Sequence, residues 1–221
     1  MSYLTKRITP VTAGVGPTPV LRKSDRTRKA ILDGALEFLW SHAFRELTVA
    51  ELMSGTGAGR SAFYQYFTDL YDLIETLLRG LEGNIFKAAE PWFDGDDDPT
   101  ARLQESLAGL VRVGYENGPI LRAVADASTT DERIEREWAR FLGEFDEAVA
   151  TRIEQHQASG LIPAFDAPPV AVALNRLDAS FLIHAFGRRP RENPEAVLEA
   201  LIRIWTSTLY DSGKPSKARK K

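Results

Sequence analysis

The sequence predicts an all-α protein of about nine helices, arranged as a small N-terminal domain and a larger C-terminal one. Apolar residues recur at helical spacing along most of the 221 residues. Capping signals and proline or glycine residues separate these segments. Because no segment alternates polar and apolar residues between turns, we expect no sheet.

Composition divides the chain into four expected regions. Residues 1–24 hold three prolines and two glycines without a helical period, which predicts a flexible basic arm. We expect residues 25–85 to form the small helical domain and residues 86–211 the large one. Residues 212–221 (SGKPSKARKK) predict a disordered basic tail.

Short polar motifs mark the helix starts of the small domain. Thr48 and Glu51 form a capping box that starts a helix at Val49, and Asp69 caps a longer helix with leucines on its buried side. The expected helices cover residues 26–42, 49–54 and 60–66, followed by a segment from residue 70 to just before Pro91.

Proline and glycine divide the large domain. Gly118 and Pro119 are expected to break one helix into two. Thr129 and Glu132 form a second capping box that starts a long helix. The expected helices cover residues 99–116, 119–127, 130–159, 168–186 and 194–210.

The formal net charge of −3 conceals an uneven distribution. The charge is +2 over residues 1–80, −10 over residues 81–211 and +5 over residues 212–221. The acidic body would repel nucleic acid, whereas the two ends would not. The chain has no cysteine, which excludes disulfides and suits a reducing cytoplasm. No apolar run approaches the roughly 18 residues that span a membrane.

The segment from Thr48 to Phe67 has the pattern of a helix-turn-helix, with a short capped helix, a glycine-rich turn and a second short helix. Ala62, Phe63 and Phe67 suit the inner face of the second helix. The outer face must offer donors to the bases and phosphates of a major groove. The residues able to do so are Arg60, Ser61, Tyr64, Gln65 and Tyr66. A small helical subdomain with surface tyrosines is the alternative.

This segment resembles the N-terminal domain of TetR-family transcriptional regulators. The resemblance covers residues 26–81 and rests on residues 47–52 (LTVAEL), Gly55, Gly57, Phe63, Tyr64, Tyr66 and Phe67. It implies binding to double-stranded DNA at a palindromic operator. The residues expected to contact DNA are Arg28, Lys29, Thr48, Arg60, Ser61, Tyr64, Gln65 and Tyr66.

Three residues depart from the family pattern. Gly59 stands where the family usually has a serine, Ala62 where it often has a threonine, and Leu70 where a lysine contacts phosphate. Phosphate neutralisation supplies much of the affinity for DNA, yet residues 26–80 carry six basic and seven acidic side chains. The alternative function is therefore a ligand- or partner-binding protein with weakened or lost DNA recognition.

The rest of the chain resembles the ligand-binding domain of EthR-type members of that family. The resemblance implies an apolar channel that binds a small-molecule effector. The expected lining is Gln104, Val111, Tyr115, Trp138, Phe141, Leu142, Phe145, Asn175, Asp178 and Trp205. The alternative for each ring is ordinary core packing.

The same resemblance implies a homodimer formed through the last two helices, residues 169–186 and 194–210. A ligand that tilts the DNA-binding domains would spoil the spacing of the two recognition helices. We therefore expect a repressor that its ligand releases from DNA. The sequence does not give the sign of regulation, so an activator stays open.

Asp178 stands where EthR-type members tend to have a neutral amide. It lies three residues after Asn175, on the same helix face. A carboxylate in an apolar channel is costly unless it is paired. Asp178 would therefore favour a ligand with an amine, or pair with Arg176 or Arg112. The alternative is a solvent-facing or salt-bridged carboxylate.

We expect neither an enzyme nor a cofactor. His42, His156 and His184 have no neighbouring set of metal ligands or nucleophile. We expect His156 on the surface and His184 in the core. Four acidic residues have the spacing of a calcium loop: Asp94, Asp96, Asp98 and Glu105. Pro99 stands where that loop requires glycine, so we reject a calcium site.

Overall fold

The computed structural model describes residues 23–95 and 97–210. Within them the chain forms eight α-helices, one short 3₁₀ helix and no strand, which confirms the all-α prediction. The elements are α1 (Lys23–Ser41), η1 (Phe44–Glu46), α2 (Val49–Ser54), α3 (Arg60–Phe63), α4 (Leu70–Asp94), α5 (Pro99–Ser128), α6 (Glu132–Ala158), α7 (Ala167–Phe186) and α8 (Pro194–Leu209). The expected arm and tail lie outside the described residues, except that Lys23 and Ser24 already belong to α1.

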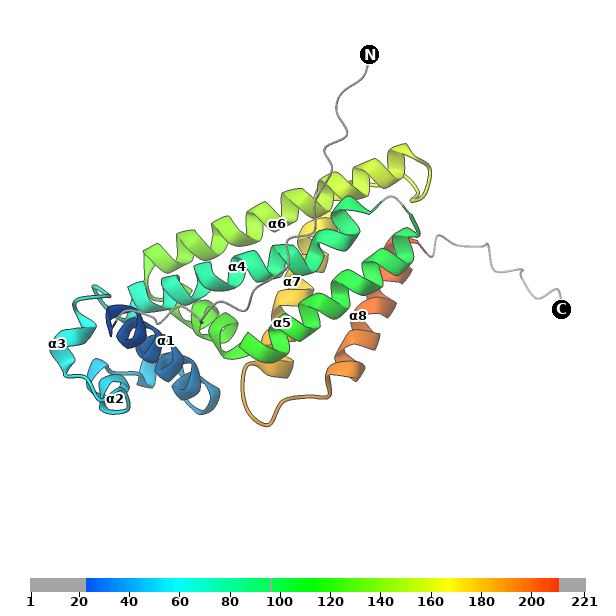
Figure 1. The fold of residues 1–221 in the computed structure, drawn as a ribbon. Coiled ribbons are helices and arrows are strands. Elements are labelled where there is room, and N and C mark those ends of the chain that lie inside the picture. The colour runs from blue at the N-terminus through cyan, green and yellow to red at the C-terminus, as the bar shows by residue number, and fades with distance from the viewer. Residues whose placement is uncertain (1–22, 96, 211–221) are drawn as a thin grey trace, which may run out of the picture.

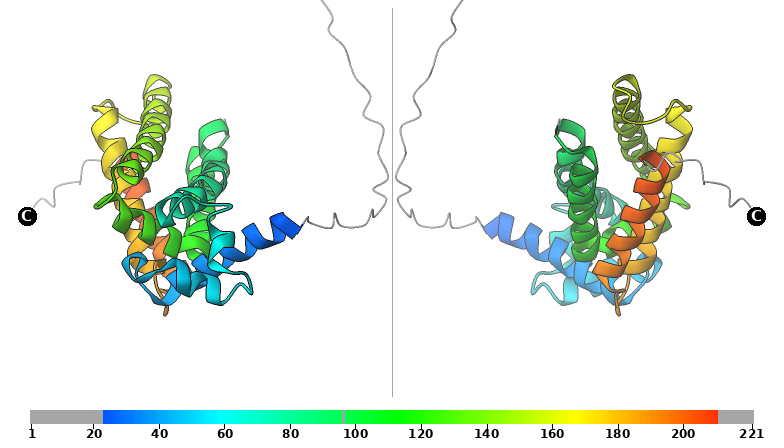
Figure 2. Two further views of the ribbon diagram at one scale, coloured as in Figure 1. Left: turned by 90° about the vertical axis from the view of Figure 1, so that its left-hand side faces the viewer. Right: turned by 90° about the vertical axis from the view of Figure 1, so that its right-hand side faces the viewer.

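The helices α1, α2 and α3 gather at one end of the molecule (Figure 1). From this end α4 runs beside α5 and α6, and α7 and α8 cover one side of these long helices (Figure 2). A single hydrophobic core extends from Ile31 of α1 to Leu209 of α8. Helix α4 crosses the expected domain boundary at residue 85 without interruption, so the two halves are mechanically continuous.

Side-chain caps define several helix starts. Thr48 Oγ1 accepts a hydrogen bond from the Glu51 amide (3.1 Å), and Asp69 Oδ1 accepts one from Asp72 (2.9 Å), as the sequence predicts. The second expected capping box is wrong. Asp131 caps α6 instead, because its carboxylate accepts from the amides of Arg133 (2.9 Å) and Ile134 (3.4 Å).

Helix α4 continues past Pro91 to Asp94, contrary to the expected end before that proline. The reason is a pair of tertiary hydrogen bonds. The Trp92 amide donates to Ser106 Oγ of α5 (2.9 Å), and the same hydroxyl donates to the Ala89 carbonyl (3.0 Å). A side chain of the neighbouring helix thus supplies polar partners to the backbone around the proline.

Helix α5 also continues through Gly118 and Pro119, which reduces the expected nine helices to eight. Because proline has no N–H, it cannot donate to the carbonyl of Tyr115 four residues earlier. Arg191 supplies that donor, with Nη1 2.7 Å from the Tyr115 oxygen. Gly118 packs so tightly on α7 that a Cβ there would collide with the Phe186 carbonyl.

Candidate functional site

A tight turn joins α2 to α3. The Thr56 hydroxyl donates to the Met53 carbonyl (2.9 Å) and accepts from the Ala58 amide (3.3 Å). Gly57 has a φ of 67°, a conformation that side chains rarely adopt. Helix α3 is shorter than the expected residues 60–66, because the chain tightens after Phe63 into bonds between residues three apart.

The two faces of α3 differ as the helix-turn-helix pattern predicts. Phe63 is fully buried and its ring centre lies 5.5 Å from that of Phe67, which is also buried. The side chains of Arg60, Ser61, Tyr64 and Gln65 are exposed. Tyr66 is half-buried and packs against the core, so it does not face outward as expected.

Within the part of the chain that the structure describes, the charged groups near α3 are few. The Arg60 guanidinium lies 6.0 Å from the centre of the Tyr64 ring, and Arg28 lies 5.5 Å from that of Phe67. Lys29 forms an exposed ion pair with Asp33 (2.5 Å). The Thr48 hydroxyl serves as the cap of α2. This surface offers hydroxyls, an amide and guanidinium groups to a polyanion.

A cavity of about 60 Å³ lies between α4, α5, α6 and α7. The structure brings six of the ten expected lining residues together there: Trp138, Phe141, Leu142, Phe145, Asn175 and Asp178. The residues that the sequence missed are Ile85, Leu110, Val113, Gly114, Leu121, Ala179 and Leu182. Helical spacing could have identified some of these residues, because Leu182 lies one turn beyond Asp178 on the same face of α7.

The other four expected residues do not line this cavity. Gln104 is exposed on α5. Val111 and Tyr115 border a separate groove between α5 and α8. Trp205 of α8 is buried behind Asp178 and reaches the cavity only through that carboxylate.

Asp178 is buried, with 7% of its surface exposed. Trp205 Nε1 donates to both of its oxygens (3.0 and 3.1 Å). Burial raises the pKa of Asp178 to about 7, because the interior disfavours the charged form. Neither arginine expected as its partner pairs with it, since Arg176 binds Asp146 (2.8 Å) and Arg112 is exposed. Asp178 is thus neither solvent-facing nor salt-bridged.

Two histidines reverse their expected positions. His156 is buried, where its Nδ1 lies 2.9 Å from the Tyr210 hydroxyl, and burial lowers its pKa. His184 is exposed on α7. Asp98, from the rejected calcium loop, caps α5 by accepting from the Thr100 amide (3.0 Å). No group of three potential metal ligands occurs in the described part of the chain.

Comparisons with known proteins support the sequence resemblance. Residues 31–77 match the family "Bacterial regulatory proteins, tetR family", and residues 103–211 match "Transcriptional regulator EthR, C-terminal domain". The protein is a TetR-family transcriptional regulator with an EthR-type C-terminal domain. This is a family of DNA-binding regulators and not of enzymes.

Individual relatives agree with this assignment. The chain is 26% identical to the HTH-type transcriptional regulator EthR of Mycolicibacterium smegmatis, over 90% of this chain and 95% of that protein. It is 26% identical to EthR of Mycobacterium tuberculosis over 84% and 88%. The crystal structure of PfmR, a TetR-family regulator from Thermus thermophilus, shares the fold with a TM-score of 0.67 and 15% identity, over 86% and 97%.

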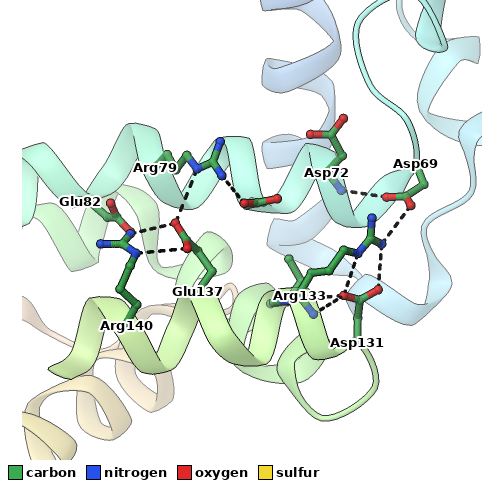
Figure 3. A network of polar contacts seen from close by, with 10 residues as sticks. Asp69, Asp72, Arg79, Glu82, Asp131, Arg133, Glu137 and Arg140 are labelled. Carbon is green, nitrogen blue, oxygen red and sulfur yellow. Dashed lines mark hydrogen bonds and ion pairs between the residues drawn. The ribbon is translucent and has the colours of Figure 1, made fainter. Parts of the chain in front are cut away.

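In this TetR-family chain an ion-pair network joins the start of α4 to α6 (Figure 3). Arg133 bridges Asp69, two residues after the helix-turn-helix, and Asp131 (3.0 and 2.8 Å). Two turns further along, Arg140 of α6 bridges Glu82 of α4 and Glu137 (2.7 and 2.8 Å). Helix α6, which carries the aromatic rings of the cavity, is therefore joined by ion pairs to α4, the helix that follows α3.

A second link joins α5 to the end of α1. The guanidinium of Arg122 is buried and donates to the Leu39 carbonyl (2.7 Å) and to the His42 carbonyl. The carbonyls at the C-terminal end of α1 have no amide donors within the helix. A positive charge is favourable there, because that end of the helix dipole is negative. The described residues contain no helix long and apolar enough to cross a membrane.

Proposed function

We propose that the protein is a homodimeric repressor that leaves a palindromic operator when a small, mainly apolar ligand fills the cavity. In this proposal residues 25–85 bind DNA in the bacterial cytoplasm, and residues 86–211 bind the ligand and the second copy. One observation carries the proposal. Leu121 lines the cavity, and its neighbour Arg122 holds the end of α1. A ligand that displaces α5 would move the helix-turn-helix.

The ion pairs between α4 and α6 support the same coupling, because a shift of α6 would be transmitted to Asp69. A ligand changes the equilibrium only by its differential affinity for the two arrangements. In a twofold dimer the two α3 helices must sit roughly 34–36 Å apart to enter successive major grooves. A small tilt of each helix-turn-helix would spoil that spacing.

Apolar side chains on the last two helices support dimerisation there. Val172 of α7 is exposed, while Leu177 and Phe181 of α7 and Leu198 and Ile202 of α8 are half-buried. Apolar residues gathered on one side of a molecule are typical of a protein–protein interface. We infer that a second copy packs on α7 and α8.

A second candidate function has its own support. Gly59 has no side chain to cap α3, Lys29 is occupied by Asp33, and Leu70 offers no charge. These features favour a ligand- or partner-binding protein of this fold with weakened or lost DNA recognition.

Titration of labelled DNA separates the two candidates. The duplexes are the segments flanking the protein's own gene and those enriched by selection from random sequences. Fluorescence anisotropy is measured at two salt concentrations. A repressor should bind one palindrome tightly, with strong loss of affinity at higher salt.

Tyr64→Ala should weaken that binding roughly tenfold, since Tyr64 is exposed beside Arg60 on α3. Leu161→Ala is the matched control, because Leu161 is equally exposed but lies on the α6–α7 connection. If no selected duplex binds better than random DNA at low salt, the repressor proposal fails and the second candidate stands.

A further inference from the structure

The cavity between α4, α5, α6 and α7 contains hydrogen-bond acceptors and no cation. Among the described residues that line it, Asp178 is the only one with an ionisable side chain. Trp205 is the one side chain that donates to Asp178 there, and no basic side chain forms an ion pair with it. A carboxylate can accept about four hydrogen bonds, so about half of its capacity is unused.

Asn175, one turn before Asp178, also has unused hydrogen-bonding capacity. Its Nδ2 donates to Asp146 Oδ1 (2.8 Å). The reversed amide would place an oxygen against that carboxylate, so hydrogen bonding fixes the orientation of the amide. The Oδ1 of Asn175 is then left buried without a donor. A buried acceptor of this kind normally has a partner.

Aromatic rings of α6 form the facing wall. Trp138 and Phe141 are stacked, with ring centres 5.6 Å apart, and Phe145 lies one turn further along the helix. The faces of aromatic rings carry negative potential and attract cations, most strongly where water is excluded. The acceptors on α7 and the rings on α6 therefore favour the same kind of ligand.

We propose that the effector is a small primary or secondary amine, held as an ammonium ion by Asp178 and Asn175 with its apolar chain among the rings of α6. This inference rests on the proposed function, because it gives the chemical class of that ligand. The cavity of about 60 Å³ has room for the ammonium group and the first carbons of its chain, and a longer chain would displace α5 as the proposed function requires. A quaternary ammonium has no N–H and would leave Asn175 without a donor.

Tryptophan fluorescence of the full chain without DNA tests the inference, since Trp138 lines the cavity. The probes are hexylamine, 1-hexanol and hexyltrimethylammonium, which share one chain and differ in the head group. Hexylamine should bind roughly tenfold more tightly than hexanol, as expected for hydrogen bonds to a charged group. The quaternary probe should bind more weakly than hexylamine.

Asp178→Asn should remove the preference for hexylamine and leave the affinity for hexanol unchanged. Asp166→Asn is the matched control, because it makes the same charge change at the exposed start of α7 and should keep the preference. Circular dichroism confirms that both variants fold.

Equal affinity for hexylamine and hexanol, or an unchanged preference in Asp178→Asn, overturns the amine inference. In either case the hexanol signal shows that the cavity binds ligands, and the proposed function stands. If neither hexylamine nor hexanol binds, the amine inference also fails. The DNA titration, which uses no ligand, then decides separately whether the protein is a regulator.

Discussion

The helix-turn-helix end and the cavity region differ in the side chains that they bury. Within the described chain, residues 23–95 bury only apolar side chains, whereas the buried polar or charged residues all lie further along. They are Ser106, Arg122, His156, Asn175 and Asp178. The first region is stabilised by transfer of apolar surface out of water. The second also contains groups that are costly to bury unless they are paired.

Three of the five buried polar residues have a clear structural partner. Ser106 bonds to the backbone of α4, Arg122 to the end of α1, and His156 to Tyr210. Asn175 has a buried oxygen without a donor, Asp178 has a single donor group in Trp205, and both residues line the cavity. Of the buried side-chain atoms without a partner in the described chain, Asn175 Oδ1 lies in the cavity, where a ligand could supply a donor, whereas Arg122 Nε and Thr206 Oγ1 lie elsewhere. Replacement of a buried apolar residue and replacement of Asp178 should therefore have opposite effects on stability.

Phe63→Ala should give the largest effect, because Phe63 is fully buried in the small domain. Loss of its ring leaves a void and should reduce the free energy of unfolding by about 3–5 kcal/mol. Urea unfolding measures this change. Tyr64→Ala removes a neighbouring exposed ring and serves as the control. Similar losses in the two variants would contradict the assigned faces of α3.

Asp178→Asn should instead stabilise the protein above neutral pH. The pKa of Asp178 is about 7 in the folded state and 3.8 in the unfolded state. Between these pH values the folded state keeps a proton on Asp178 that the unfolded state has lost. Stability therefore falls as pH rises through this window, by about 2–3 kcal/mol between about pH 5 and about pH 8. Urea unfolding at both pH values should show that stability falls by this much more in the wild type than in Asp178→Asn, since other groups such as His156 contribute equally to both proteins. An identical fall in Asp178→Asn would disprove this origin.

Arg122→Met tests the link between α5 and α1. The substitution leaves the carbonyls of Leu39 and His42 without their donor, which should cost about 1–3 kcal/mol. Thermal unfolding gives the loss of stability. Hydrogen exchange should show faster opening at the end of α1. Arg112→Met removes an exposed arginine of the same helix and should change neither quantity.

Thr48→Ala should have the smallest effect, about 1 kcal/mol, because it removes only the cap of α2. Thr48→Ser keeps a hydroxyl at this position and should retain most of the stability. Denaturant unfolding of the two variants compares them directly. Equal stability of the alanine and serine variants would show that the cap contributes nothing.

Local signals in the sequence were sufficient to predict the caps at Thr48 and Asp69 and the buried face of α3. These features depend on residues within one or two helical turns. The continuity of α4 and α5 could not be predicted in this way. It depends on hydrogen-bond partners that are distant in sequence: Ser106 lies 14 residues after Trp92, and Arg191 lies 76 residues after Tyr115.

The cavity shows the same limit. Two sequence neighbours on α5, Leu110 and Val111, face different neighbours, one the cavity and the other the groove beside α8. Adjacent positions on a helix differ by about 100° in direction. A family resemblance predicts which residues form a helix more securely than it predicts which side of that helix faces the cavity. The predicted residues of α6 all line the cavity, because they form a continuous apolar stripe on that helix.

The hydrogen bond from Arg191 to the carbonyl that Pro119 leaves free has a consequence for evolution of this chain. The proline creates the need for the arginine, and the arginine makes the proline tolerable. A descendant that replaces Pro119 regains an amide donor at that turn and relaxes selection on Arg191. One that first loses Arg191 leaves the carbonyl without its donor. The two positions should therefore co-vary, with changes at 119 preceding those at 191.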